Sequence, residues 1–366
     1  MDNLILRDDI IDDDLEIFEI INHGIPRQVF LRPDLFHSHD DRAFFSRFRL
    51  TKETVLQLLP SIEPYIERPY NRNNTVTPMN QLLITLMYFA SNSHMVTISD
   101  VGKMNKSTVC RIIKRVSNAI ARLYRDYIIF PRNELEVNQT KNKFFDIASF
   151  PNVIGAVDGT HIRILSPGGD DAEIFRNRKN YFSINVQVIS NAYLEITDLV
   201  ARWPGSVHDV TIFNNSIIRR QFENGQHPDC FLLGDSAYAM KDYLLTPLQN
   251  PRTEPEQLYN ESHIRTRGAV EKLFGIWKRR FPILAYGCRL KLDNILTIIV
   301  ATAVLYNIAK KMGEAEPPLP AEVDEHEFQV LLRNGDIPVV PILNPNQLLG
   351  PQVRQNLIIN YFANLQ

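Results

Sequence analysis

The spacing of hydrophobic residues changes along the chain from helical to alternating and back to helical. In NYFSINVQVIS (180–190), hydrophobic residues occupy every second position, which is the spacing of a half-buried strand. NVIGAVDGTHIRIL (152–165) and LEITDLVARWPGS (194–206) also alternate, and the three runs together predict an antiparallel meander. A helix over 208–223 and a short buried strand in CFLLGD (230–235) are predicted to follow.

Helical spacing prevails on both sides of these strands. Upstream, TPMNQLLITLMYFASN (77–92) places apolar residues every three or four positions, and its proline suits the first turn of a helix. Downstream, a polar insertion that contains prolines (246–264) precedes helices predicted over 265–281, 294–313 and 350–365.

Residues 97–123 combine a short helix, a tight turn at 104–106 and a second helix capped by Ser107 or Thr108. The polar face of the second helix is basic and carries Arg111, Lys114 and Arg115. This pattern is typical of a helix-turn-helix that binds DNA. The alternative is an ordinary helical hairpin with a solvated basic face.

The order of the elements is three strands, a helix, a fourth strand and then helices. This order indicates an α/β protein with a ribonuclease H-like core, although other α/β folds share parts of it. We predict four regions: an acidic N-terminal arm (1–45), a helical region with the helix-turn-helix (46–130), a ribonuclease H-like domain (150–312), and a Pro-rich linker with a C-terminal helix (313–366).

Composition narrows the class of protein. The chain has 366 residues, of which 44% are hydrophobic, so a sizeable core is expected. The absence of an apolar run of about 18 residues predicts no membrane span. The acidic start lacks the basic region of a signal peptide. Three widely spaced cysteines indicate reduced thiols in an intracellular protein.

The distribution of charge is more informative than the net charge of −2. Residues 103–125 contain seven Lys/Arg and no acid, and residues 265–289 contain seven Lys/Arg and one acid. The first twenty residues contain eight acids and one arginine. Such asymmetry indicates binding to a polyanion, and solvated basic helix faces are the alternative explanation.

Three acids occupy positions that solvent exposure does not explain. Asp158 interrupts the first strand, Asp235 ends the fourth, and Glu271 lies in the first turns of a helix that is otherwise apolar or basic. Each has an ordinary explanation, because Asp-Gly and Gly-Asp form turns and a glutamate near a helix start favours the helix dipole. Together they match the need of two divalent cations on a phosphodiester for several oxygen ligands.

The placement of these acids supports the interpretation that they bind metal ions. Strands one and four are neighbours in a ribonuclease H-like sheet, so Asp158 and Asp235 are expected to converge there. The segment RWPGSVHDV adds Asp209, which is expected near the metal; the alternative is that Ser206 or Asp209 caps the helix that follows. His208 either contacts substrate or forms a structural hydrogen bond.

Five motifs follow one another in the order of the PIF/Harbinger transposase family. They are IGAVDGTHIRI, NYFSINVQVISN, WPGSVHDVTIF, LLGDSAYAMKDYLLTPL and RTRGAVEKLFGIWKRRFPIL. The chain resembles this family, and within it the transposase-derived nucleases, over about residues 40–312. The resemblance implies a DDE nuclease with Asp158, Asp235 and Glu271 as its catalytic acids and metal ligands, and Asp209 as a further metal contact.

The resemblance also implies the reaction and the partners. The expected reaction is hydrolysis of DNA phosphodiesters with Mg²⁺ or Mn²⁺ and, in a mobile element, joining of the freed 3′ ends to target DNA. The basic residues Lys278, Arg279 and Arg280 are expected to attract DNA phosphates, as are those of the predicted helix-turn-helix. A Myb/SANT-like DNA-binding partner that aids nuclear import is implied, with the protein in nucleus and cytoplasm. The oligomeric state stays open, with a homo-oligomer as one option.

Two other functions remain as alternatives. A domesticated, catalytically silent DNA-binding or scaffold protein would keep the basic surfaces and hold the acids without using them. A glycosidase that uses two carboxylates is the weaker alternative, because that chemistry needs two acids rather than three among basic residues.

Overall fold

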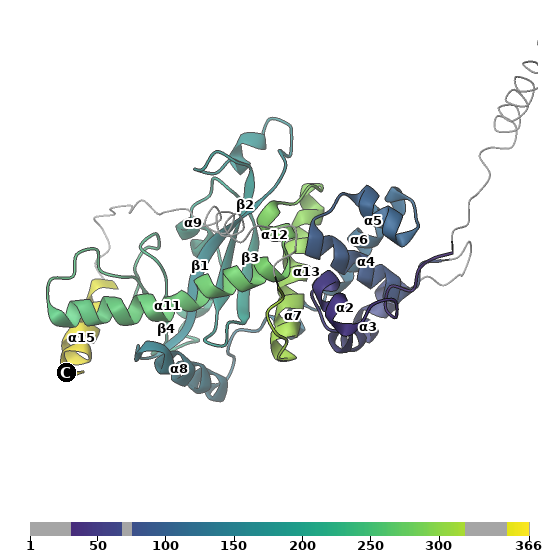
Figure 1. The fold of residues 1–366 in the computed structure, drawn as a ribbon. Helices are drawn as coiled ribbons and strands as arrows, with labels where there is room; N and C mark the ends of the chain where they lie inside the picture. Colours follow the sequence, from purple (N-terminus) through teal and green to yellow (C-terminus); the bar gives the residue numbers. More distant parts are fainter. Residues whose placement is uncertain (1–30, 68–74, 319–349, 366) are drawn as a thin grey trace, which may run out of the picture.

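The computed structural model describes residues 31–67, 75–318 and 350–365. Most of the predicted acidic arm (1–30) and most of the predicted Pro-rich linker (319–349) lie outside these ranges. Within them, one sheet flanked by helices stands beside a helical region, so the chain is a mixed α/β protein as predicted (Figure 1).

Five strands form one mixed sheet in the order β3-β2-β1-β4-β5. They are β1 (Val153–Arg163), β2 (Ser183–Ser190), β3 (Ile196–Pro204), β4 (Phe231–Leu233) and β5 (Leu244–Leu245). The first three pair antiparallel, β4 lies parallel to β1, and β5 lies parallel to β4. The structure confirms the predicted meander and the predicted adjacency of the first and fourth strands. β5 was not predicted, because two residues are too short to show a period.

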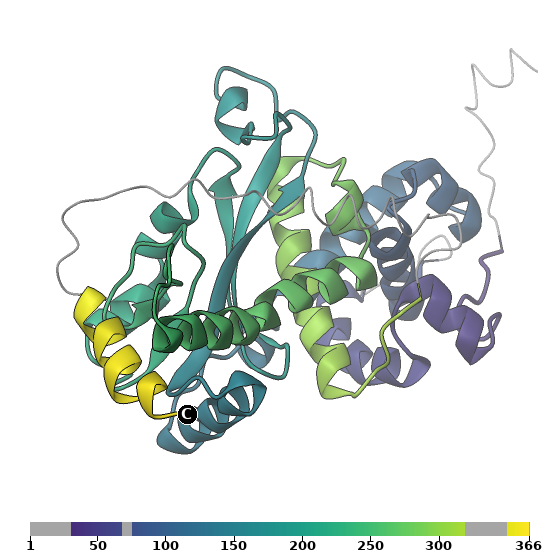
Figure 2. The same cartoon turned by 60° about the vertical axis from the view of Figure 1, so that its left-hand side comes forward.

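Helices cover both faces of the sheet. On one face, α11 (Glu254–Arg280) crosses β1 and α13 (Leu292–Lys311) packs on β3 (Figures 1 and 2). On the other face, α9 (Asp209–Asn214) and α10 (Ile217–Glu223) join a separate apolar cluster with the sheet. Because side chains alternate along a strand, successive residues of β1 face these two layers in turn.

The N-terminal helical region is organised around α6. It contains α2 (Asp41–Phe48), α3 (Lys52–Ile66), α4 (Pro78–Ser91), α5 (Met95–Gly102) and α6 (Lys106–Ala121). The side chains of Asp40, Thr51 and Thr77 each accept a backbone hydrogen bond and so cap α2, α3 and α4. α6 packs against α3, α4 and α5 and also against α13, which joins the helical region to the sheet.

The remaining elements connect and cover this frame. α7 (Tyr124–Tyr127) and α8 (Glu134–Ala148) lead from the helical region into β1, and the turn η1 (Ala172–Phe175) lies between β1 and β2. α12 (Ile283–Tyr286) follows α11. α15 (Gly350–Asn360) and the turn η2 (Phe362–Asn364) pack on α11, where Phe362 is buried against Phe150 and Tyr259.

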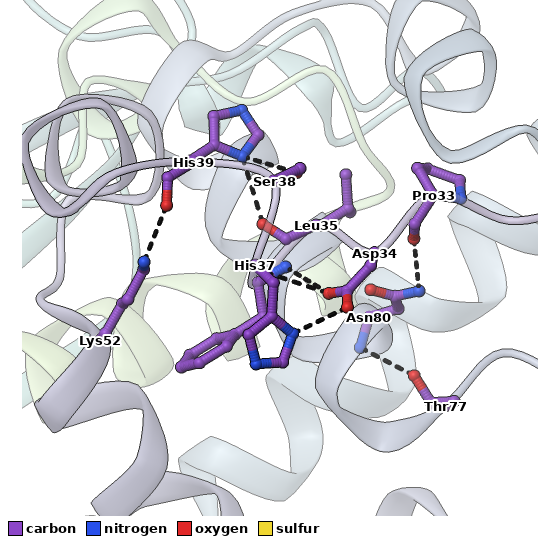
Figure 3. Close-up of polar contacts among 10 residues, drawn as sticks. Pro33, Asp34, Leu35, His37, Ser38, His39, Lys52, Thr77 and Asn80 are labelled. Carbon is purple, nitrogen blue, oxygen red and sulfur yellow. Dashed lines mark hydrogen bonds and ion pairs between the residues drawn. The ribbon is translucent and has the colours of Figure 1, made fainter.

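The segment before α2 is held on the helical region by two hydrogen bonds to its backbone. Asn80 Nδ2 donates to Pro33 O at 3.1 Å, and Lys52 Nζ donates to His39 O at 2.7 Å. Both contacts are drawn as dashed lines in Figure 3. The last residues of the predicted arm lie in α2, where Phe44 is fully buried. This part of the arm therefore belongs to the helical region.

A buried cluster around Arg280 joins the end of α11 to the helical region. The Arg280 guanidinium donates to Arg49 O at 2.7 Å, to Ala315 O at 2.7 Å and to Glu314 Oε2 at 2.6 Å. Glu314 Oε1 also accepts from the backbone and hydroxyl of Thr51, at 2.8 and 3.0 Å. Residues just after α13, which were predicted to start a linker, thus contribute to the core.

The single helix predicted over 208–223 is two helices, α9 and α10. The break comes at Asn215–Ser216, where Ser216 Oγ accepts a hydrogen bond from Arg219 N at 3.1 Å and caps α10. The apolar pattern continues through the break, which is why periodicity alone did not reveal it.

The helix α11 begins much earlier than predicted. Thr253 and Glu256 form a capping box at its start, so most of the predicted polar insertion (246–264) is helical. The following helix, α13, is long and apolar enough to cross a membrane by length and composition. However, 67% of its most apolar window is buried inside the protein, as expected for a core helix.

Candidate functional site

Asp158 and Asp235 lie at one level of the neighbouring parallel strands β1 and β4. Ala156 pairs with Leu233, and each acid follows its paired residue by two positions. Residues two apart on a strand point to the same side. Burial raises the pKa of Asp158 and the Asp235 charge raises it further, so the two carboxyl groups interact electrostatically.

Asp158 is a strand residue and not a turn residue. It pairs with Val188 of β2, and Gly159 pairs with Gln187, so this Asp-Gly pair lies inside a ladder. Asp235 is both a turn residue and a member of the cluster, because its Oδ1 accepts from Ala237 N at 2.9 Å. The turn explanation is thus excluded for Asp158 and is compatible with a site role for Asp235.

Glu271 lies in the middle of α11, so a role at the helix N-terminus does not explain it. Arg267, one turn earlier, bridges Glu271 and Asp158. Its Nη1 donates to Asp158 Oδ2 at 2.9 Å, and its Nη2 donates to Glu271 Oε1. The Arg267 side chain is 14% exposed and that of Asp158 is 17% exposed, whereas Glu271 is 54% exposed. Glu271 therefore stands at the open side of the cluster.

Asp209 approaches the cluster from the α9 layer. Asn185 of β2 donates from Nδ2 to Asp209 Oδ1 at 2.7 Å, and a Cβ at Gly159 would collide with the same carboxylate. The N-cap of α9 is His208, and no side chain caps this helix. Capping by Ser206 or Asp209 is therefore not found, and Asp209 is held by β2 beside the glycine that follows Asp158.

The phenol of Tyr238 lies among these acids. Its hydroxyl is buried and has no hydrogen-bond partner within the described residues. Burial raises the pKa of Tyr238 well above its ordinary value, and Asp209, Asp158 and Asp235 raise it further. Gly234 allows the ring to approach, since a Cβ there would lie 2.9 Å from the ring. An unpaired hydroxyl is thus buried within a group of carboxylates.

Burial and mutual repulsion together raise the pKa values of three acids in the cluster. Burial raises the pKa of Asp158 well above its ordinary value; Arg267 opposes this, and the charges of Asp235 and Asp209 add to it. Burial also raises the pKa of Asp209 to about 6, with a contribution from Asp235. The pKa of Asp235 is raised by burial and further by Glu271. Raised pKa values with this cause indicate a site that favours additional positive charge.

The donor chemistry of the cluster fits a divalent cation. Carboxylate oxygens from rigid elements are the ligands that Mg²⁺ and Mn²⁺ prefer. Within the described residues, no three His, Cys, Asp or Glu side chains already form an arrangement that could hold a metal. Arg267 lies between Asp158 and Glu271 instead. The guanidinium must leave these carboxylates before they can close on a cation.

Basic side chains surround one flank of the cluster. The pKa of His161 is lowered to about 3 by burial and then by the charges of Lys278, Lys179 and Arg178. Arg178 also lies beside the ring of His208, with Nη2 3.3 Å from Nε2. His208 thus forms the hydrogen-bonded contact that was one of its two predicted roles.

The structure places the predicted DNA-contacting residues of α11 in different environments. Lys278 is buried and donates to Thr160 Oγ1 at 2.6 Å, and Arg279 is partly buried. Arg280 is 2% exposed and is held by carbonyls and Glu314. The expectation of a DNA contact by Arg280 does not fit this placement, because the last turn of α11 enters the core between the sheet and the helical region.

The predicted helix-turn-helix corresponds to α5, the connection 103–105 and α6. Arg111 and Lys114 are exposed on α6. Arg115 is partly buried and donates to Gln81 Oε1 of α4 at 3.0 Å. Since α6 is the central helix of its region, only a narrow face of it reaches solvent, and DNA binding by this face stays a prediction.

Sequence reasoning missed four residues of the site: Gly159, Asn185, Tyr238 and Arg267. The spacing of Arg267 and Glu271, one helical turn apart, is a signal that could have identified Arg267. Gly159, Asn185 and Tyr238 carry no charge, and the last two are also distant from Asp158 in sequence. Only the folded sheet brings them together.

Comparisons with known proteins identify relatives of this chain by sequence. The protein family described as DDE superfamily endonuclease matches residues 157–307. The curated "Putative nuclease HARBI1" of Homo sapiens is 29% identical over 276 residues, which cover 75% of this chain and 79% of that protein. The rat protein of the same name is 29% identical over 334 residues, covering 88% and 91% of the two chains.

A plant relative is more distant. "Protein ALP1-like" of Arabidopsis thaliana is 24% identical over 298 residues, covering 76% of this chain and 73% of that protein. No solved structure matches the chain significantly. The matches span both the sheet and much of the helical region.

Proposed function

We propose that this chain, which carries a DDE superfamily endonuclease domain and is homologous to the Harbinger transposase-derived nucleases, is a metal-dependent DNA endonuclease. The observation that carries the proposal is the carboxylate cluster. Asp158, Asp209 and Asp235, from different elements, act on one buried hydroxyl, and all three have raised pKa values. Glu271 is joined to Asp158 through Arg267. In this proposal Asp158, Asp235 and Glu271 are catalytic and Asp209 is a further metal contact.

The sheet supports assignment to the ribonuclease H-like architecture. Three antiparallel strands followed by a fourth strand parallel to the first give the order β3-β2-β1-β4-β5. In this arrangement the first strand is central, and helices cover both faces. Such a sheet holds Asp158 on a rigid strand, which suits a ligand that must keep its position through a reaction.

The carboxylates would hold one or two Mg²⁺ or Mn²⁺ ions. Bound there, such ions activate the attacking water and stabilise the leaving oxygen of a phosphodiester in an in-line displacement. Asp158 and Asp235 supply rigid oxygen ligands, and the exposed Glu271 faces the side from which DNA enters. Asn185 fixes Asp209 by its 2.7 Å hydrogen bond. If the chain is still mobile, the freed 3′ hydroxyl would be the attacking group in joining to target DNA.

Arg267 has a separate role in this proposal. Without a cation it neutralises Asp158 and Glu271. When a cation replaces it, its guanidinium is free to bind a DNA phosphate, for which its planar fork is well suited. Lys179 and Arg178, whose charges lower the pKa of His161 after burial, would contribute to the same phosphate-binding flank, whereas Lys278 is buried against Thr160 and does not reach DNA.

A nicking assay on supercoiled DNA tests the proposal. We expect cleavage by the full chain with Mg²⁺ or Mn²⁺, together with a Myb/SANT-like partner, and none with EDTA. Asp235→Asn should abolish cleavage and leave the thermal unfolding of the metal-free protein unchanged, because the amide keeps the turn bond to Ala237 N. Wild-type activity in Asp158→Asn or Glu271→Gln would rule out these residues as catalytic acids.

A catalytically silent DNA-binding or scaffold protein is the second candidate function. The Arg267 bridge favours it, since this guanidinium already pairs with two of the acids. Binding of Mn²⁺ separates the two functions. A silent scaffold should bind DNA with the usual salt dependence yet show no Mn²⁺ affinity that depends on Asp158.

We extend the proposal to partner and location. A Myb/SANT-like partner would supply site-specific DNA binding and nuclear import, with the protein in both nucleus and cytoplasm. Imaging of the tagged chain with and without such a partner tests this. An unchanged distribution on co-expression would refute the import role.

A further inference from the structure

An open groove lies where the edge strand β3 meets the helical region. Its volume is about 870 Å³, and it is lined by parts of α6, β3, α10 and α13. A second hollow of about 610 Å³ shares Arg202, Asn215, Ser216 and Arg220 with it, so the two form one continuous depression. The carboxylate cluster does not line either hollow.

Three arginines from three different elements line the groove. Arg122 follows α6, Arg202 lies on β3, and Arg220 lies on α10. All three are exposed, and none forms an ion pair within the described residues. Arg122 stacks over the Tyr65 ring, with the guanidinium carbon 4.9 Å from its centre, which holds the side chain in place and leaves its N–H groups available.

The other lining residues also suit an anionic ligand. Asn118 and Asn215 also line the groove. Each Nδ2 donates one hydrogen bond to a backbone carbonyl one turn earlier, which leaves a second N–H that can contact a phosphate oxygen. Of the described residues that line the groove, Asp198 alone is acidic, and its side chain is partly buried. The positive charge of the groove is therefore largely uncompensated within the described chain.

The groove is continuous with the exposed basic face of α6. A small recess adjoins the groove, because Thr297 lines both of them. Lys114 of α6 lines this recess. Arg111 lies one turn before Lys114 on the same exposed face. A basic path thus runs from the start of α6 along this helix to β3 and α10.

The groove also approaches the carboxylate cluster. Asp209 is the first residue of α9, and Asn214 at the other end of this helix lines the second hollow. Six residues of helix span about 9 Å, so this end of the depression lies one short helix away from Asp209.

We propose that this arginine groove binds the sugar-phosphate backbone of DNA that flanks the cleavage site, without reading its sequence. The proposal rests on the proposed function in taking DNA as the substrate. DNA is favoured over an acidic protein segment because the basic path connects the predicted DNA-binding helix to the candidate catalytic acids. Guanidinium groups bind phosphate in a bidentate manner, which suits this ligand.

Fluorescence anisotropy with a short DNA duplex of arbitrary sequence tests the proposal on the full chain. The test variant replaces Arg122, Arg202 and Arg220 by Gln. We expect its affinity at low salt to fall by about tenfold or more. The slope of log Kobs against log salt should fall by about 2–3, because each phosphate contact contributes about 0.9.

Two matched variants control for net charge and for folding. Arg132→Gln/Arg252→Gln/Arg289→Gln removes the same charge from exposed positions outside the groove, and it should keep the wild-type slope. Replacing the three groove arginines by Lys should restore most of the slope, since the slope counts charges. Equal losses in the groove variant and the surface variant would overturn the proposal, and so would a groove variant with wild-type affinity.

A synthetic peptide of residues 1–20, which carry eight acids, tests the main rival occupant. Peptide binding that the groove variant loses, with DNA affinity unchanged, would assign the groove to the chain's own acidic arm and overturn the proposal. The test of the groove and the test of nuclease activity can fail independently. DNA binding that depends on the groove in a chain without nuclease activity would support the groove alone, whereas cleavage with an unaffected groove variant would support the nuclease alone.

Discussion

Asp158 and Asp235 converge because of strand register, and the sequence could indicate this through the order of the strands. Arg267 and Gly159 act through contacts that only the folded chain creates. At the residue scale, therefore, the carboxylates of the candidate site were recognisable in advance, whereas the groups that position and neutralise them were not.

Gly159→Ala should impair the site with little effect on the fold. A Cβ at this position would collide with the Asp209 carboxylate and displace it from Asn185. We expect weaker Mn²⁺ binding and slower cleavage, with thermal unfolding changed by no more than a few degrees. Titration of Mn²⁺ into the purified variant checks this. Wild-type affinity would show that Asp209 is not a metal contact.

Arg267→Gln should destabilise the metal-free protein by about 3 kcal/mol, because it leaves two carboxylates without their cation. Added Mn²⁺ should recover part of this loss by supplying the missing positive charge. Urea unfolding with EDTA and with Mn²⁺ measures both effects. Arg265→Gln is the matched control, because Arg265 is 61% exposed and its ion pair within the described residues is with the exposed Glu261, so its loss should cost under about 1 kcal/mol. Equal destabilisation with and without Mn²⁺ would contradict the exchange of guanidinium for metal.

Asp198→Asn should stabilise the protein at neutral pH. Burial raises the pKa of Asp198 to about 6, and a hydrogen bond from Leu199 opposes this. The folded state therefore binds the proton more tightly than the unfolded state. The stability linked to this proton is present below about pH 4 and is lost as pH rises through about 6. We expect the Asp198→Asn variant to gain on the order of 2 kcal/mol at pH 7.5, and this gain should vanish near pH 4 in urea unfolding. A gain that does not change with pH would contradict this explanation.

At the element scale, the long strands and apolar helices followed from periodicity. β1, β2, β3 and α13 lie within a few residues of their predicted positions. The break between α9 and α10 and the early start of α11 did not follow, because capping by Ser216 and by the Thr253–Glu256 box decides them. The early start matters for function, since it places Glu271 mid-helix and removes the helix-dipole explanation for it.

Glu314→Gln tests how the end of α11 is joined to the helical region. The Glu314 carboxylate accepts from Arg280 on one oxygen and from Thr51 on the other. Its side chain and that of Arg280 are each 2% exposed. Neutralising it leaves a buried guanidinium without its counter-charge, so we expect a loss of about 3–5 kcal/mol in urea unfolding. Glu316→Gln, at an exposed position, should change little. Similar small losses in both variants would argue against a structural role for the pair.

At the scale of the whole molecule, metal binding and folding should be coupled through the carboxylate cluster. A ligand that binds only the folded state at about 100 times its Kd stabilises by about 2.7 kcal/mol. We expect Mn²⁺ to raise the unfolding temperature of the wild type and to have no such effect on Asp158→Asn. Differential scanning calorimetry of both proteins measures this. An identical response in the two would place the metal elsewhere in the chain.

The sequence by itself was enough to infer the α/β class and to single out the acids whose chemistry suits a nuclease centre. Alternating and helical spacing specify elements because they depend only on local geometry, and the ordered motifs specify a resemblance to one family. Tertiary structure decided which charges are available. It buries Arg280 beside Glu314, places Arg267 between Asp158 and Glu271, and gathers Arg122, Arg202 and Arg220 into one groove. Apart from Arg267 and Glu271, which lie one helical turn apart, these groups are distant in sequence, so their charge and burial depend on the packing of whole elements and not on a local pattern.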